Sequence, residues 1–505
     1  MRQACFPTAS LRASTANHRA KKSYLRLKVM KNYLQKRIRR VTTLSAFAAL
    51  FVSLLLLLGC GGGTSSPSPN PQPNTTPLQV NIGDAPSDRL VAVSMTIGSM
   101  SLTKSGGGSV SVVSSSTPVE VMHLMGTVNP ISLMNVPQGS YPGATVSISS
   151  ATVLYMDPTA MQLVQKSVSG PMMATVNFNP SMTVGTSPMV LNLDMNMASS
   201  VSIDNSDKVT MTPTMTATMN QCCTGNSQNP EDGGMEHMTG TVMSMSGNSF
   251  TMSMMQSSQN ISVTTGSGTQ FEGMGGMGGM SNGMIVMVDA TMQADGTFMA
   301  QKVESMMAMS GGSMADGLVM GLSGSPVTQL TIATMDGTGS GMTGSDLAGT
   351  ITVNVSPTAA FNIDSDHVDM SNLPFTPTFD GTTVFKGQRV EAVSSTGMMS
   401  GGGMGGMMGG GTIDASEIDL EQQGLSGTVS GYAGSGTPTT FTLMLPSDSA
   451  FTTLTGAATV TVFQQPGTQL WGMTTITNGS TVHVRGLLFF DAGTYKLVAG
   501  RIMAP

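Results

Sequence analysis

The chain has 505 residues, of which only 10% are charged and 5% are aromatic. Twelve of its 22 Lys and Arg residues lie in residues 1–59, which contain no Asp or Glu, so the rest of the chain carries ten basic and 28 acidic residues. Such an acidic remainder argues against nucleic-acid binding, which needs basic patches that replace counterions. The length predicts three to four domains.

Residues 1–59 are predicted to be a leader that is removed from the mature protein. A mainly apolar run of 15 residues, 44–58, follows a basic flank and is followed by Gly59, which is the pattern of a cleaved signal. The run is too short for a membrane-spanning helix, which needs about 20 residues, although an uncleaved anchor is the alternative. Met30 is the expected true start, because residues 30–59 then have the ordinary dimensions of a signal.

Residues 57–60, Leu-Leu-Gly-Cys, resemble a lipobox, the motif that ends in the lipid-bearing cysteine of bacterial lipoproteins. The resemblance implies that Cys60 carries a lipid and attaches the chain to a membrane outside the cytoplasm. Residues 60–77 are rich in Gly, Ser and Pro, which cannot bury a core, and are predicted to form a tether. An Asp directly after the lipid-bearing cysteine would retain a lipoprotein in the inner membrane, and this chain has Gly61 there. We therefore expect the chain to be anchored in the outer membrane of the cell envelope, where it faces the periplasm or the cell surface.

Residues 78–219 are predicted to form a β domain, because short apolar and β-branched runs alternate with turn residues. The alternation of apolar residues over 91–97 slips by one at Gly98, which predicts a β-bulge. Further strands are expected at residues 78–82, 110–112, 119–124, 144–155, 163–168, 189–195 and 209–219.

This stretch resembles domain-of-unknown-function family 4382, which occurs in secreted lipoproteins of bacteria and archaea. The matching segments include VNIGDAPSD, VSMTIGSMSL and VPQGSYPGATVSISSATV, and together they cover residues 80–88, 93–102, 119–125, 136–153, 190–201 and 212–214. The resemblance implies a β-sandwich. It brings no known activity and no catalytic residues.

Residues 220–238 are expected to be a linker, and three similar units follow at residues 239–305, 317–420 and 424–505. Each unit has a glycine-initiated strand, two further strands and a final strand pair, which indicates a repeated small domain. The units resemble domain-of-unknown-function family 5666, a family of small extracytoplasmic β-barrel repeats. The predicted fold class is therefore all-β, with one β-sandwich domain followed by three small OB-like β-barrel repeats. Such barrels often bind oligosaccharides or oligonucleotides, but this is an analogy of fold alone.

Methionine is unusually frequent, with 48 residues. One interpretation is that Met replaces Leu and Val in the cores, because its side chain is flexible and fills irregular gaps. In the Gly-Met segment 273–280, however, glycine offers no packing partner, so exposed thioethers are expected that could bind Cu(I) or silver or scavenge oxidants. The candidate metal ligands are Met274, Met277 and Met280 of this segment, and the cluster of Cys222, Cys223, Met235, His237 and Met238. The two adjacent cysteines leave three states open: a vicinal disulfide, an intermolecular bond or a free pair.

Other motifs give weaker indications. The acidic segment 364–369 begins like a calcium loop but lacks the glycine and the final glutamate of that motif, so a solvated acidic turn is favoured. The glycines of segment 273–278 match the dinucleotide-binding fingerprint without the strand–turn–helix unit that it requires. His123 and His483 lie in strand patterns, and we expect them to be sheet or surface residues rather than catalytic bases.

These observations predict a lipid-anchored extracytoplasmic protein that is not an enzyme and serves surface binding, adhesion or envelope structure. The alternative is a Met-rich envelope protein that binds copper or silver or scavenges oxidants. No cofactor is expected, apart from Cu(I) in that alternative. The expected partners are the membrane, through the lipid anchor, and a carbohydrate or protein ligand, but not nucleic acid.

Overall fold

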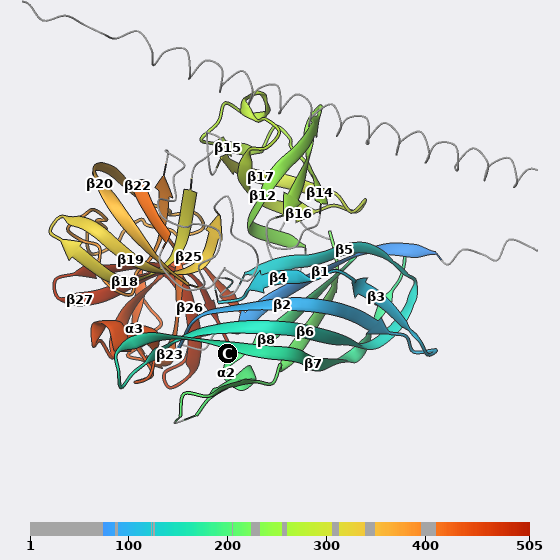
Figure 1. Ribbon diagram of the computed structural model, residues 1–505, viewed down its shortest axis with the longest axis horizontal. Coiled ribbons are helices and arrows are strands. Elements are labelled where there is room, and N and C mark those ends of the chain that lie inside the picture. Colours follow the sequence, from blue (N-terminus) through green and yellow to red (C-terminus); the bar gives the residue numbers. More distant parts are fainter. Residues whose placement is uncertain are drawn as a thin grey trace, which may run out of the picture. The chain divides into compact units, whose positions relative to one another are not determined.

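The computed structural model describes residues 74–85, 89–122, 124, 127–204, 206–223, 233–254, 260–305, 313–338, 349–394 and 411–504 (Figure 1). The predicted leader, Cys60 and the tether up to residue 73 lie outside these ranges, as does His123. All described elements belong to one compact unit, Pro73–Pro505. None of the helices in the described ranges has the length and apolar character that a membrane span needs.

Two sheets form the first domain. One sheet has the order β11-β8-β1-β5, in which β1 (Thr75–Ala85) pairs in parallel with β8 (Met189–Asn196) and antiparallel with β5 (Val128–Pro137). Its outer strand β11 (Met215–Gln221) pairs antiparallel with β8. A short helix, α2 (Met197–Ser200), follows β8.

The second sheet has the order β3-β2-β6-β7, and β4 pairs with β2. The bounds are β2 (Leu90–Thr103), β3 (Ser109–Val113), β4 (Thr117–Glu120), β6 (Gly139–Asp157) and β7 (Gln162–Val184), and the small pair β9 (Val201–Ile203) and β10 (Val209–Met211) lies outside both sheets. Alternate residues of the two sheets contribute to a single apolar core. The predicted β-sandwich is therefore confirmed.

The predicted bulge at Gly98 is present in β2. Ile97 lies opposite Ile148 of β6, but Ser99 lies opposite Ser147, so one extra residue is accommodated on β2. The bulge keeps the apolar residues on both sides of it facing the core, because each residue shifts a strand's pattern by one face.

Three barrels with the same strand order follow, and we call them repeats 1, 2 and 3. Repeats 2 and 3 are closed barrels with the orders β18-β19-β20-β22-β21 and β23-β24-β25-β27-β26. In repeat 1 the strands follow β14-β13-β12-β16-β17, and a further pairing between β14 and β17 joins the two ends of that path. In each repeat the third and the last strands pair in parallel. The prediction of an all-β chain with OB-like barrels is thus confirmed.

The strand bounds differ from the expected boundaries at several points. β12 begins at Gly234, inside the expected linker, and β18 begins at Ser313. The elements of repeat 1 are β12 (Gly234–Ser246), β13 (Ser249–Met254), β14 (Asn260–Thr264), β15 (Gln270–Glu272), η2 (Met277–Gly279), β16 (Ile285–Met292) and β17 (Phe298–Ser305). Those of repeat 2 are β18 (Ser313–Gly324), β19 (Val327–Thr338), β20 (Gly349–Ile363), β21 (Arg389–Ser394) and β22 (Gly411–Leu420). Those of repeat 3 are β23 (Gln423–Ser430), β24 (Thr439–Met444), α3 (Ala450–Thr455), β25 (Thr459–Trp471), β26 (Thr481–Asp491) and β27 (Thr494–Met503).

The glycine in the first strand of each repeat has a steric reason. A Cβ atom at Gly317 would lie 2.0 Å from the carbonyl oxygen of Ala333, and one at Gly427 would lie 2.4 Å from that of Met444. At Gly240 it would meet the Met252 side chain at 2.5 Å. Because the first and second strands approach so closely as the barrel curves, only glycine fits there.

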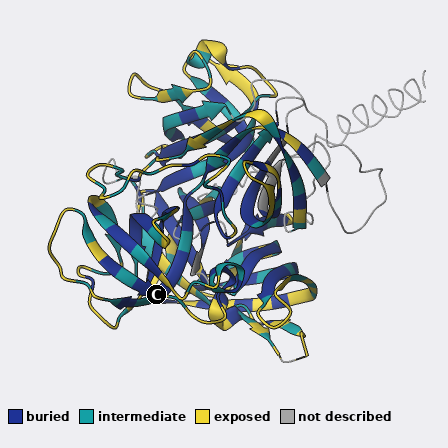
Figure 2. Cartoon of the chain, turned by 90° about the vertical axis from the view of Figure 1, so that its left-hand side faces the viewer, coloured by how far each residue is buried: buried dark blue, intermediate teal, exposed yellow. Residues whose placement is uncertain are grey.

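Apolar clusters join the domains. Val91 and Leu154 of the sandwich pack with Leu318 of repeat 2 and Ala450 of repeat 3. Leu487, from repeat 3, is part of the core of repeat 2. Figure 2 shows buried residues along the strands and exposed ones concentrated in the turns. The repeats are therefore held in contact by burial of apolar surface.

Candidate functional site

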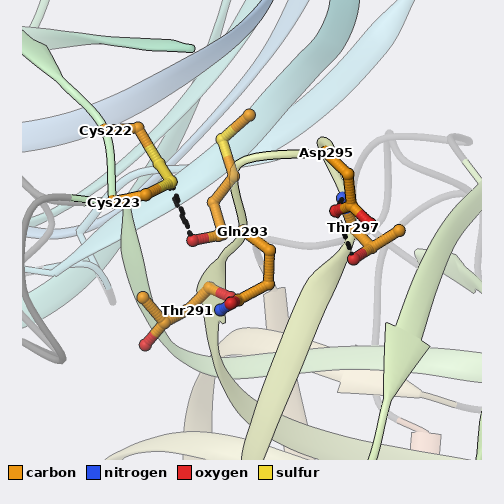
Figure 3. Close-up of a disulfide and its surroundings, with 7 residues drawn as sticks. Cys222, Cys223, Thr291, Gln293, Asp295 and Thr297 are labelled. Atoms are coloured by element: carbon orange, nitrogen blue, oxygen red, sulfur yellow. Dashed lines mark hydrogen bonds between the residues drawn. A yellow bond between two sulfur atoms is a disulfide. The ribbon is translucent and has the colours of Figure 1, made fainter. Parts of the chain in front are cut away.

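Three residues of the predicted metal cluster lie inside the core of repeat 1. Cys222, Met235 and Met238 are 4%, 0% and 3% exposed and pack against the other apolar side chains of this repeat. Cys222 and Cys223 form a disulfide, and the Cys223 sulfur lies 3.0 Å from the carbonyl oxygen of Met292 (Figure 3). A disulfide offers no thiolate to a metal. The vicinal disulfide is thus the state, of the three left open, that the structure shows.

The Gly-Met segment of repeat 1 is not exposed as expected. Met280 is 5% exposed, and Met274 and Met277 are partly buried, and all three pack against the core of repeat 1. The flexible thioether chains reach back from a glycine-rich turn and fill the end of the barrel. No group of three or more His, Cys, Asp or Glu in the described ranges is placed to hold a metal ion. Metal binding by these residues stays a prediction, and the second Gly-Met segment, 395–410, lies outside the described residues.

His237 lies in a β-bulge that separates it from its methionine neighbours. Met235 is opposite Ala290 and Met238 is opposite Val288, so Glu236 and His237 share the single partner Asp289. His237 has a φ of 56°, and its backbone N–H donates to Asp289 Oδ1 at 2.7 Å. A bulge re-aims side chains, and here it turns His237 and Glu236 toward the other two repeats.

Asp289 joins His237 to His367 of repeat 2. Nε2 of His367 lies 3.4 Å from Asp289 Oδ2, and the two imidazole rings have centroids 6.5 Å apart. Burial would raise the pKa of Asp289, but the hydrogen bond with His367 and the charge of His237 lower it overall. The same hydrogen bond raises the pKa of His367 against the effect of its burial. This contact therefore strengthens when His367 is protonated.

His483 fits the expectation of a sheet residue. It lies in β26, is 9% exposed, and its Nδ1 is 2.6 Å from Ser426 Oγ on β23. Burial lowers the pKa of His483, so the ring is held neutral.

The most unusual group of side chains lines a cavity of about 300 Å³ between repeats 1 and 2, which we call the acidic cleft. In the part of the chain that the structure describes, its wall contains eight carboxylates and one lysine, together with Asn362 and Ser305. Repeat 1 contributes through β15 and β17, and repeat 2 contributes through the end of β20, the loop after it, β21 and β22. The charged residues are Glu272, Lys302, Glu304, Asp364, Asp366, Glu391, Glu417, Asp419 and Glu421.

Strand register places like charges directly opposite one another in the cleft. Glu391 of β21 is paired with Asp419 of β22 within the cleft wall, and on its other side with Asp316 of β18, which does not line the cleft. Directly opposed like charges destabilise a sheet. Asn362 relieves part of this repulsion, because its amide donates to Glu417 at 2.6 Å and to Asp419 at 2.8 Å.

Lys302 is the only cation among the described residues that line the cleft. Its ammonium lies 3.1 Å from Glu272 and 2.9 Å from Glu304, and it also contacts Asp366 of repeat 2. Lys302 and Asp366 line a second cavity, of about 250 Å³, together with Asp289 and His367. The histidine contact and the acidic cleft are therefore neighbours that share one ion pair.

Several carboxyl pKa values in the cleft are raised, because the carboxylates outnumber the one cation beside them. Burial, followed by repulsion from Glu421, Asp316 and Asp419, raises the pKa of Glu391 well above its ordinary value. Burial and the neighbouring Asp364 act in the same way on Glu421. Burial raises the pKa of Asp419 to about 6. A cation that entered the cleft would lower the pKa values of these three carboxyl groups, because an opposite charge favours the ionised form.

Sequence reasoning set aside Asp364 and Asp366 as a failed calcium loop and did not identify the rest of the cleft. A signal was available in residues 417–421, where acidic side chains alternate along β22 and just beyond it. Alternate residues of a strand share one face, so these three carboxylates could have been recognised as one acidic surface. Their partners on repeat 1 could not, because they come from distant strands.

Comparisons with known proteins concern mainly repeat 1. Among solved structures the chain is similar to one titled "drosophila Unr CSD456", with 10% identity, covering 52% of this chain and 94% of that chain at a TM-score of 0.12, which is too low to carry a structural argument. No curated protein matches the sequence. Residues 239–304 match the model of the family "Domain of unknown function (DUF5666)", which confirms the predicted resemblance for repeat 1.

Proposed function

We propose that this protein is a lipid-anchored, non-enzymatic binding protein of the cell envelope, and that it holds a positively charged ligand in the acidic cleft. The observation that carries the proposal is the wall of eight carboxylates around a single lysine. A cleft lined by one sign of charge concentrates ligands of the opposite sign. We expected surface binding from the sequence, and we propose that the ligand is positively charged and binds in the acidic cleft.

The proposed location of the protein in the cell envelope is supported by the sequence alone. The apolar run before Cys60, the lipobox-like end and the Gly/Ser/Pro-rich tether favour an extracytoplasmic anchor. The resemblance of residues 78–219 to family 4382 favours the same compartment. We propose the outer membrane as the site of attachment.

The cleft is better suited to binding than to holding the repeats together. Glu391 and Glu421 have no ion-pair partner among the described side chains. In contrast, the buried Glu236 of repeat 1 lies 2.9 Å from Arg501 of repeat 3, and we call this contact, with the nearby pair Asp316 and Arg389, the junction. Glu391 and Glu421 are partly buried, and a carboxylate that is withdrawn from water without a cation beside it reduces stability. An arrangement that costs stability in this way is typical of a functional site.

Calorimetric titration of the full chain with Ca²⁺, Mg²⁺, spermidine and tetralysine tests the proposal. We expect at least one cation to bind, and the binding to weaken as NaCl rises from about 0.05 M to about 0.5 M, because salt screens charge attraction. A triple variant with Glu391→Gln, Asp419→Asn and Glu421→Gln should lose this binding. If no cation distinguishes the wild type from the triple variant, the cleft is not the ligand site.

Envelope attachment needs a separate experiment. Cells that produce the Cys60→Ser variant should release the protein from their membrane fraction, because the lipid attachment atom is gone. A variant that still partitions with the membranes would contradict the anchor and leave the ligand site untouched.

A further inference from the structure

The disulfide between Cys222 and Cys223 is a poor structural cross-link. It joins two neighbours in the sequence, with a separation of one residue. A disulfide stabilises a fold mainly by closing a long loop in the unfolded chain, and here almost no loop is closed. What the bond contributes to the structure is therefore the local conformation that it holds.

That local conformation is one that an open chain avoids. Cys223 has a φ of 70°, in the left-handed region that residues other than glycine rarely adopt. Such a conformation persists only where the surroundings impose it. The small covalent ring that includes both sulfur atoms is one such constraint, so opening the ring allows Cys223 to return to an ordinary backbone conformation.

The disulfide lies where the sandwich meets repeat 1. On the sandwich side, the N–H of Cys222 donates to the carbonyl oxygen of Pro188 at 2.9 Å, directly before β8. On the side of repeat 1, the sulfur atoms of Cys222 and Cys223 lie 3.6 Å and 3.0 Å from the carbonyl oxygen of Met292, where β16 ends (Figure 3). A change of conformation at the disulfide therefore acts on both domains.

The beginning of repeat 1 is packed against the same sulfur atoms. A Cβ atom at Gly233 would lie 3.3 Å from the sulfur of Cys222 and 3.0 Å from the Cβ atom of Met292. The carbonyl oxygen of Gly233 accepts a hydrogen bond from the N–H of Met292 at 2.9 Å. Val190 of β8 belongs to the same apolar cluster as Cys222 and Met292. Because this packing leaves little free space, a shift of the sulfur atoms displaces Gly233 and Met292 as well.

The two sulfur atoms differ in how far a reductant can reach them. Cys222 is 4% exposed, whereas Cys223 is only partly buried. Thiol–disulfide exchange requires that a thiolate reach one of the two sulfur atoms. The sulfur of Cys223 is therefore the expected point of attack. After reduction, the carbonyl oxygen of Met292 is close enough to accept a hydrogen bond from the Cys223 thiol.

We propose that Cys222–Cys223 is a redox-active disulfide, and that its reduction by a dithiol loosens the contact between the sandwich and repeat 1. A thiolate of the dithiol attacks the Cys223 sulfur, the bond to Cys222 breaks, and the Cys222 sulfur leaves as a thiolate and takes up a proton. The second thiolate of the dithiol then displaces Cys223, which also takes up a proton. Two electrons and two protons pass to the cysteines, and the reductant becomes a disulfide. This inference does not depend on the acidic cleft.

Reduction of the folded full chain tests the first half of the proposal. The oxidised protein is incubated with dithiothreitol in the absence of denaturant, and its thiols are then alkylated with iodoacetamide and located by peptide mass spectrometry. We expect both Cys222 and Cys223 to be alkylated. Reduction that takes place only in urea would overturn the proposal, because the bond would then be closed to a reductant in the folded protein.

Hydrogen exchange in the presence and absence of dithiothreitol tests the second half. The N–H groups of Cys222 and Met292 make the hydrogen bonds described above, and reduction should speed their exchange by at least about tenfold. The N–H of Val429, which donates to Ser480 within repeat 3 at 2.9 Å, is the internal control and should not change. Unchanged exchange at Cys222 and Met292 after complete reduction would overturn the proposal. Faster exchange throughout repeat 1 would do so as well, because the bond would then be a structural cross-link.

A double variant separates the loss of the bond from other effects of the reductant. The chain with Cys222→Ala and Cys223→Ser cannot form the disulfide, so Met292 should exchange rapidly without dithiothreitol and should not respond to it. Met243→Ala, at a position in repeat 1 that is 53% exposed, is the matched control and should respond like the wild type. Thermal unfolding of the double variant should occur near the temperature of the wild type, because the bond closes almost no loop. If the double variant does not fold, the bond is a structural cross-link and the proposal is wrong.

Discussion

Two groups of charged side chains lie where the repeats meet, and they differ in whether opposite charges are paired. At the junction, Glu236 of repeat 1 lies 2.9 Å from Arg501 of repeat 3, and Asp316 receives two hydrogen bonds from Arg389. In the acidic cleft, eight carboxylates face one lysine. The junction charges are paired within the chain, whereas the cleft has more carboxylates than cations, and under the proposed function a ligand neutralises the excess. A charge that serves the fold should therefore be costly to remove, and one that serves a ligand should not.

The largest expected effect concerns the junction. Glu236→Ala leaves Arg501 buried without its carboxylate, and removal of one partner of a buried pair costs about 3–5 kcal/mol. Both side chains are well buried, at 3% and 5% exposure, so solvent screening is small. Urea denaturation of the full chain measures the loss, with Asp448→Asn as a control that should change stability by less than about 0.5 kcal/mol. A loss below about 1 kcal/mol for Glu236→Ala would remove the distinction between the two groups.

A second prediction concerns the wall that repeat 1 contributes to the cleft. Glu272 immediately precedes the Gly-Met turn, whose Met280 is 5% exposed and packs in the core. Met280→Ala should cost about 2–4 kcal/mol through the cavity that it leaves. Met243→Ala, at a position that is 53% exposed, should be nearly neutral in the same denaturation experiment. Equal effects of the two changes would mean that the Gly-Met turn does not support the cleft.

The difference between the two regions also explains what could be predicted from the sequence. The bulge at Gly98 and the glycine of each first strand follow from local spacing, because alternation and steric contact act over a few residues. The wall of the cleft brings together residues more than a hundred positions apart in the sequence, such as Glu272 and Glu421. No local pattern specifies that repeats 1 and 2 meet along these faces.

Local prediction also failed where a side chain replaced a backbone partner. The pattern predicted a strand over residues 119–124, but β4 ends at Glu120. The Glu120 carboxylate accepts hydrogen bonds from the backbone N–H of Val93 at 2.7 Å and of Met122 at 3.1 Å. A buried side chain that satisfies two backbone donors ends the ladder there, and apolar periodicity contains no sign of it.

A third prediction uses pH to distinguish the cleft from the junction. The folded-state pKa of Asp419 is about 6, above its ordinary value of 3.8, so the folded protein binds more protons than the unfolded chain between these values. The unfolding free energy that Asp419 contributes is therefore present at low pH and lost as the pH rises through about 6. The pKa values of Glu391 and Glu421 are also raised, so their contributions to the unfolding free energy change with pH in the same direction. Glu236, whose pKa is lowered by Arg501 against its burial, has the opposite sign.

Asp419→Asn isolates this effect from the other titrating groups. As the pH rises from about 4 to about 7, the free energy of unfolding of the variant should increase by about 1–2 kcal/mol relative to that of the wild type. This figure is smaller than the full pKa shift would give, because Asp419 is only partly buried and solvent screens its charge. Urea denaturation at several pH values measures the difference. Parallel pH profiles for the two proteins would show that Asp419 titrates normally in the folded state.

The smallest expected change in stability is the most informative, because Glu391→Gln should stabilise the protein whereas Glu236→Ala should destabilise it. Glu391→Gln removes one of two directly opposed carboxylates on β21 and β22, and relief of a cross-strand like-charge contact should stabilise the protein by about 0.5–1 kcal/mol at about pH 7.5. The same change should weaken cation binding, so that stability rises while affinity falls. A variant that instead loses stability would mean that Glu391 has a structural partner, and the cleft would then belong with the paired charges of the junction. A gain in stability without a loss of affinity would place the ligand on other carboxylates of the wall.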